Sequence, residues 1–215
     1  MADGDQGEDR DPGDVRRLFD RASARPFLFV VAGLAVALLD VRVGFFDLLP
    51  DAVGYAAVAH ALTLPALAGC GRDSVAGRVA ALVGLGASVP GVVSVGWTRH
   101  ADQMLVSGGW VPDAFGQLLG LVEAMAAAAV LFFLCRVVSR LATDGGLDEV
   151  AGYADQYGPW TPIPLLLAAL LGLVVLVGGQ PAPEAVAALV QLGVYAAFAV
   201  PIVLLAWVDH RGQAD

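Results

Sequence analysis

Six stretches of the chain contain almost no charged residues and are rich in Ala, Leu and Val. They cover residues 27–39, 52–71, 75–97, 114–135, 162–178 and 185–208. A helix needs about 20 apolar residues to cross the roughly 30 Å hydrocarbon core of a bilayer. The stretches are continuous rather than alternating, which favours helices over a closed β-barrel, the other fold that satisfies its backbone in lipid. The sequence therefore predicts an all-α, polytopic bundle of about six transmembrane helices.

The overall composition agrees with a membrane protein. Hydrophobic residues make up 58% of the chain and charged residues 15%, against about 45–50% and about 25% in soluble domains. Seven of the 21 acidic residues fall within the first 20 positions. We interpret residues 1–24 as a disordered, acidic cytoplasmic tail, because a signal peptide would be poor in acids. Residues 25–209 are then the membrane domain, and residues 210–215 are a second cytoplasmic tail.

The arginines predict how the bundle is oriented, since the chain has no lysine. With a cytoplasmic N-terminus and six spans, only Arg42 and Arg99 lie outside, and the other arginines lie inside. Loops on the cytoplasmic side carry the excess of positive charge, so both termini are expected in the cytoplasm. Tryptophans then occur near both membrane surfaces, as aromatic belts do: Trp97 and Trp110 at the outer one, Trp160 and Trp207 at the inner one.

A short motif recurs within the chain. Residues 50–55 read Pro-Asp-Ala-Val-Gly-Tyr, and residues 112–117 read Pro-Asp-Ala-Phe-Gly-Gln. Pro50 and Pro112 suit the start of a helix, and Asp51 and Asp113 complement the positive end of its dipole. The recurrence indicates duplicated hairpins with Asp51 and Asp113 at equivalent places near the outer surface. The alternative is that Pro-Asp is a favourable helix start that arose twice.

The predicted hairpins cover residues 25–71, 75–140 and 160–209, the third with the weakest sign of the repeat. Between the last two, apolar residues recur at helical spacing. They predict a short interfacial helix near residues 144–157, on the cytoplasmic side.

Two ionisable residues lie well inside predicted spans. They are His60, near the middle of the second span, and Glu123, about a third of the way into the fourth. Charge is costly in lipid, so both side chains are expected to face the bundle interior. The repeat brings them to similar depth, where a His–Glu pair could relay protons or bind a cation. The alternative is that each only forms a hydrogen bond that fixes helix packing.

Polar residues near the predicted outer face match no metal-binding motif, and helix caps and surface ion pairs account for most of them. The sequence contains no Walker A, H-E-x-x-H, G-x-S-x-G or C-x-x-C motif, and too few basic residues for a nucleic-acid surface. We therefore predict no metal, no cofactor and no nucleic-acid partner. Cys70 and Cys135 are expected to be buried, reduced thiols. The outer-face group comprises Asp40, Arg42, Asp47, Asp51, Arg99, His100, Asp102 and Asp113.

One segment resembles a known group of proteins. Residues 44–55 read Gly-Phe-Phe-Asp-Leu-Leu-Pro-Asp-Ala-Val-Gly-Tyr. This is similar to an F-D-[LI]-L-P-D-x-[IV]-G-Y motif that follows the first span in uncharacterised multi-spanning bacterial membrane proteins. The resemblance covers under a tenth of the chain and implies a bacterial cytoplasmic membrane protein, but no activity. Its motif residues here are Asp47, Pro50, Asp51, Gly54 and Tyr55.

Three functions remain open from the sequence. The first is a non-enzymatic accessory or scaffold-like membrane protein, with the lipid bilayer and a membrane protein or a homo-oligomer as partners. The second is a transporter or channel for an ion or small solute, using His60 and Glu123. Pro65, Pro90 and Pro201 favour it weakly, because prolines kink spans. The third is an intramembrane enzyme that acts on lipid.

Overall fold

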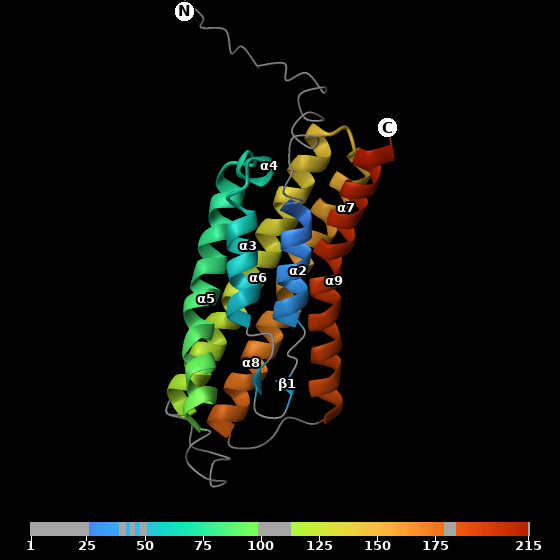
Figure 1. The fold of residues 1–215 in the computed structure, drawn as a ribbon. Helices are drawn as coiled ribbons and strands as arrows, with labels where there is room; N and C mark the ends of the chain where they lie inside the picture. The colour runs from blue at the N-terminus through green and yellow to red at the C-terminus, as the bar shows by residue number, and fades with distance from the viewer. Residues whose placement is uncertain are drawn as a thin grey trace, which may run out of the picture.

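The computed structural model describes residues 26–38, 42–43, 46–47, 51–98, 113–178 and 184–214. They form an elongated helical bundle (Figure 1), so the predicted helical class is confirmed. The elements are α2 (Pro26–Leu38), α3 (Asp51–Ala61), α4 (Pro65–Ala68), α5 (Arg72–Thr98), α6 (Asp113–Asp144), α7 (Asp148–Tyr157), the 3-10 helix η1 (Gly158–Trp160), α8 (Pro162–Gly178) and α9 (Glu184–Ala214).

The long helices alternate in direction along the bundle. α2, α5 and α8 run toward the end where β1 lies, and α3, α6 and α9 run back (Figure 1). Each predicted apolar stretch falls on one of these helices, except that the second extends over both α3 and α4. Within the described residues, two segments are long and apolar enough to cross a membrane, Leu118–Asp144 in α6 and Glu184–Val208 in α9.

The second predicted stretch, residues 52–71, is broken rather than continuous. α3 ends at Ala61 and α4 begins at Pro65. A proline ring disfavours helical conformation in the residue before it, and Leu64 is accordingly extended, with φ −68° and ψ 143°. The Ser74 hydroxyl, near the start of α5, donates a hydrogen bond of 3.0 Å to the free carbonyl of Leu62. The proline thus ends the helix, whereas α9 continues through Pro201.

A tight turn leads from α6 into α7. Gly146 has a φ of 70°, which glycine adopts without the steric cost that a side chain would add. The Leu147 N–H donates to the Ala142 carbonyl at 2.7 Å, a hydrogen bond typical of helix C-termini. α7 then packs against α6 and α9, near the end of the bundle where α6 ends (Figure 1).

The core is built around α6, which packs against α5, α7, α8 and α9. Leu131, Leu134, Val137 and Val138 of α6 are fully buried. Many large apolar side chains instead point outward. They include Leu28 and Phe29 in α2, Val75, Val79, Leu82 and Val83 in α5, Leu166, Leu170 and Val174 in α8, and Leu189, Leu192 and Val203 in α9.

A small β-hairpin that the sequence did not predict lies between α2 and α3. Its strands are β1 (Arg42–Val43) and β2 (Phe46–Asp47), which pair antiparallel with Arg42 opposite Asp47. Two residues per strand give too short a pattern for sequence periodicity to reveal. The hairpin lies at the end of the bundle away from the start of α2 (Figure 1).

Candidate functional site

Polar groups of α3 and α6 meet inside the bundle, at what we call the Asp51–Tyr55–Glu123 junction. The Tyr55 hydroxyl donates a hydrogen bond of 3.3 Å to the backbone carbonyl of Glu123. The side-chain carboxyl group of Asp51 also lies close enough to that of Glu123 for the two groups to interact electrostatically. Asp51 and Tyr55 are four residues apart, so they share one face of α3. The first turns of α3 therefore bind both the main chain and the side chain of Glu123.

The two carboxyl groups lie in a partly enclosed part of the bundle. Glu123 is partly buried, and Tyr55 is only 6% exposed. The junction therefore brings two acidic side chains together at a partly buried contact between α3 and α6.

Glycines let the helices approach closely around Tyr55. A Cβ added at Gly84 of α5 would lie 2.5 Å from the Tyr55 ring, so this ring packs directly on the α5 backbone. A Cβ at Gly33 of α2 would lie 2.8 Å from the Gly54 carbonyl. Small residues give membrane helices this kind of contact. Gly54 and Tyr55 of the motif thus pack α3 against α2 and α5.

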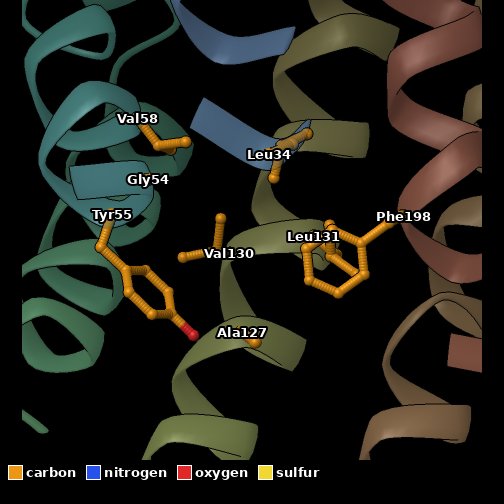
Figure 2. Close-up of a pocket in the computed structure, with 8 residues that line it drawn as sticks. All are labelled: Leu34, Gly54, Tyr55, Val58, Ala127, Val130, Leu131 and Phe198. Atoms are coloured by element: carbon orange, nitrogen blue, oxygen red, sulfur yellow. The ribbon is translucent and has the colours of Figure 1, made fainter. Parts of the chain in front are cut away.

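A small cavity lies beside the junction, at the meeting of α2, α3, α6 and α9 (Figure 2). Its volume is about 10 Å³, close to the least that holds one water molecule. Tyr55 supplies the one polar side chain in its lining, and Figure 2 shows its hydroxyl directed toward α6, beside Ala127. The lining residues are Leu34, Gly54, Tyr55, Val58, Ala127, Val130, Leu131 and Phe198.

The structure does not bring His60 and Glu123 together, so the predicted pairing is wrong. His60 is exposed on α3, with its ring edge-on to Phe29 at a centroid distance of 5.8 Å. Glu123 contacts Asp51, which precedes His60 by nine residues, about 13 Å along a helix. His60 is therefore at another depth, on a face that α6 does not cover.

The two aspartates of the repeated motif also lie at different depths in the bundle. Asp51 contacts Glu123, which follows Asp113 by ten residues on α6. Ten residues of helix span about 15 Å along the axis. Asp51 and Asp113 each begin a helix that runs away from the β1 end (Figure 1). They are not at equivalent depth, so the prediction of equivalent places is wrong in that respect. A common origin of the hairpins stays a prediction.

The remaining predicted site residues do not join the junction. Asp47 lies in β2, opposite Arg42. Pro50, Pro112, Arg99 and His100 lie outside the described residues, as do Asp40 and Asp102. Within the described ranges, no group of three or more His, Cys, Asp or Glu side chains could hold a metal ion.

A second polar cluster, which the sequence did not predict, fastens α5 to α6. The Asp73 carboxylate is 2.9 Å from Nε of Arg140 and 3.5 Å from Nε of Arg136. Arg140 also donates through Nη1 to the Cys70 carbonyl at 2.8 Å. Asp73 is buried, while both arginines are about half exposed. The sequence did contain a pattern that could have predicted this cluster. Asp73 lies in the first turn of α5, and Arg136 and Arg140 are four residues apart near the end of α6.

Both cysteines are free and buried, as predicted. Cys70 lies in the turn between α4 and α5, outside the long helices. Its thiol is 3.9 Å from the Val137 carbonyl, and burial raises the pKa of this thiol to about 11.

The chain matches no protein-family model, no curated protein and no solved structure.

Proposed function

We propose that the chain is a six-span integral protein of a bacterial cytoplasmic membrane with a non-enzymatic, scaffold-like role. The outward apolar side chains of α2, α5, α8 and α9 support the membrane assignment. Apolar surface on this scale marks contact with a membrane or another protein. The six alternating helices support six spans, and the resemblance of residues 44–55 supports a bacterial source.

The distribution of arginines supports cytoplasmic termini. In the described part of the chain, Arg72 and Arg140 lie at the end where α2 begins and α9 ends, whereas Arg42 of β1 lies at the other (Figure 1). Positive charge gathers on the cytoplasmic side of membrane proteins. Aromatic residues of α7, η1 and α9 fit an interfacial belt there: Tyr153, Tyr157, Trp160 and Trp207, with the Tyr153 and Trp207 rings 5.7 Å apart.

The observation that carries the scaffold role is the close packing of Tyr55 at the junction. Tyr55 packs on the backbone of Gly84 and bonds to that of Glu123. The neighbouring cavity of about 10 Å³ accommodates at most about one water molecule. Close packing of this kind supports a structural role rather than passage of a solute between α3 and α6.

Flux measurements on purified protein in liposomes test this role. We expect proton and potassium fluxes equal to those of empty liposomes, both for the natural sequence and for Glu123→Gln. The control is Glu149→Gln, which changes an exposed carboxyl of α7. A flux that Glu123→Gln abolishes and Glu149→Gln preserves would contradict the scaffold role.

Cysteines introduced at Gly4 and Gln213 test the topology. Neither should react with a membrane-impermeant maleimide in intact cells, and both should react after the cells are opened. Reaction of either cysteine from outside would contradict cytoplasmic termini.

Transport is the second candidate, and one observation favours it. Asp51 and Glu123 bring two carboxyl groups together within the bundle, and intramembrane carboxyl groups often belong to proton pathways. This version of the transport hypothesis rests on Asp51 in place of His60. The lipid-enzyme hypothesis depends on an outer-face pocket of Asp47, Asp51, Arg99 and His100, and the last two of these lie outside the described residues.

A further inference from the structure

The outward face of α9 carries two polar side chains one turn apart. Gln191 and Tyr195 are both exposed, Tyr195 by 47%. Among the described residues, neither side chain has a hydrogen-bond partner. α9 lies at the edge of the bundle (Figure 1), and its packing partners are α8, α6, α2 and α7.

The depth of these side chains makes their exposure costly. The span in α9 is Glu184–Val208, so Gln191 and Tyr195 lie about 10 and 16 Å from its start. Both positions fall within a hydrocarbon layer of about 30 Å. A primary amide in hydrocarbon lacks the hydrogen bonds that water would supply, and tyrosine is enriched at membrane surfaces rather than at mid-depth. A helix from another molecule would satisfy both groups.

The neighbouring residues allow such a helix to approach. Ala188, Gln191, Tyr195 and Ala199 are all exposed and fall within about 80° of the α9 circumference. Ala188 and Ala199 leave room for a second backbone at the two ends of the stripe, and the exposed Leu192 beside it offers an apolar contact. Glutamine side chains hydrogen-bond across membrane helices. We call this stripe the α9 face.

We propose that the α9 face binds a second copy of this chain, with Gln191 hydrogen-bonded to Gln191 of the partner subunit. This inference rests on the membrane-spanning fold proposed above. All copies insert in the same orientation, so a two-fold axis along the membrane normal brings each residue to its own equivalent at equal depth. An amide both donates and accepts, so two glutamines complement each other. A second copy is the one partner certain to present such a group at this depth.

Cross-linking of the full-length protein in native membranes tests the contact. Ala188→Cys should form a disulfide-linked dimer under mild oxidation. The control is Val174→Cys, on the exposed face of α8, which should stay monomeric. Cross-links from both positions, from neither, or from Ala188→Cys only to a different protein would overturn the proposal.

A measurement of affinity in lipid nanodiscs or liposomes tests the role of the amide. Gln191→Leu should raise the dimer dissociation constant about 3- to 30-fold, the range for interhelical hydrogen bonds in membranes. The control is Leu189→Ala. Leu189 is also exposed on α9 but lies off the stripe, so this substitution should leave the dimer dissociation constant unchanged. An unchanged dimer in Gln191→Leu overturns the proposal.

Alkaline carbonate extraction separates the two possible failures. A protein that stays in the membrane pellet but forms no dimer refutes the α9 contact alone. A protein that carbonate releases refutes the membrane assignment, and the α9 contact with it.

Discussion

The Tyr55 hydroxyl donates a hydrogen bond to the main chain of Glu123, whereas Asp51 interacts with the Glu123 side chain. The two contacts at one residue are therefore separable. Substituting the Glu123 side chain removes the partner of Asp51 but leaves the acceptor of Tyr55 in place. Stability measurements can then assign each contact its own contribution.

Tyr55→Phe should lower the free energy of unfolding by about 0.5–1.5 kcal/mol, the usual net contribution of one hydrogen bond. Thermal unfolding in detergent measures this loss. The loss should be the same when Glu123 is replaced by Gln, since the acceptor is a backbone carbonyl. A loss that vanishes in the Glu123→Gln background would show that the hydroxyl bonds to the side chain instead.

Asp51→Asn and Glu123→Gln should be energetically coupled, because the two carboxyl groups interact with each other. Contacting residues show interaction energies of about 0.5–3 kcal/mol in double-mutant cycles. Asp51→Asn combined with Glu149→Gln supplies the reference, since Glu149 is an exposed residue of α7. Additive effects of Asp51→Asn and Glu123→Gln would mean that the carboxyl contact is absent in solution.

Gly84→Ala should destabilise the bundle by about 1–3 kcal/mol, the cost of overpacking a well-packed core. The new methyl group would lie 2.5 Å from the Tyr55 ring. Gly86→Ala, two residues along the same helix, has nothing within 4 Å of its added Cβ. It should be neutral or should stabilise α5 by up to about 1 kcal/mol through helix propensity. Equal effects of the two substitutions would rule out close packing of Tyr55 on Gly84.

Asp73→Asn should destabilise the α5–α6 contact by about 0.2–1 kcal/mol, the usual range for ion pairs whose partners are open to solvent. It removes the negative charge that lies against Arg136 and Arg140. Asp148→Asn is the control, since Asp148 is exposed in the first turn of α7. If both variants unfold at the same temperature as the natural protein, the ion pairs contribute nothing to stability.

Cys70 should react slowly with maleimide at neutral pH. The raised pKa of its thiol, about 11 instead of 9.0, reduces the reactive thiolate fraction about a hundredfold. The rate should rise with each pH unit up to pH 11, and it should rise sharply on unfolding at constant pH. Rapid labelling of the folded protein at pH 7 would show that Cys70 is accessible.

Sequence patterns predicted the helical class and the position of each long helix because apolar stretches report helices directly. They failed where the result depends on how far one helix extends past another. α6 begins ten residues before Glu123, the residue of α6 that contacts Asp51. No local sequence pattern encodes this offset between α3 and α6. The prediction assumed that aligned positions of the two motif copies lie at the same depth, which placed His60 beside Glu123. Asp51 and Tyr55 could have been recognised as a pair, since their spacing places both on one face of α3.

The hydrogen bond from Ser74 to the Leu62 carbonyl has a consequence for biogenesis. α3 has 11 residues, about 16 Å of helix, which is too short to cross a bilayer unaided. The break after it leaves a carbonyl that lipid could not satisfy, and the hydroxyl that does so belongs to α5, the next span of the proposed fold. In that proposed fold, the α3–α4 segment reaches a stable state in lipid only with α5 beside it. We expect the translocation machinery to release these helices together rather than one at a time.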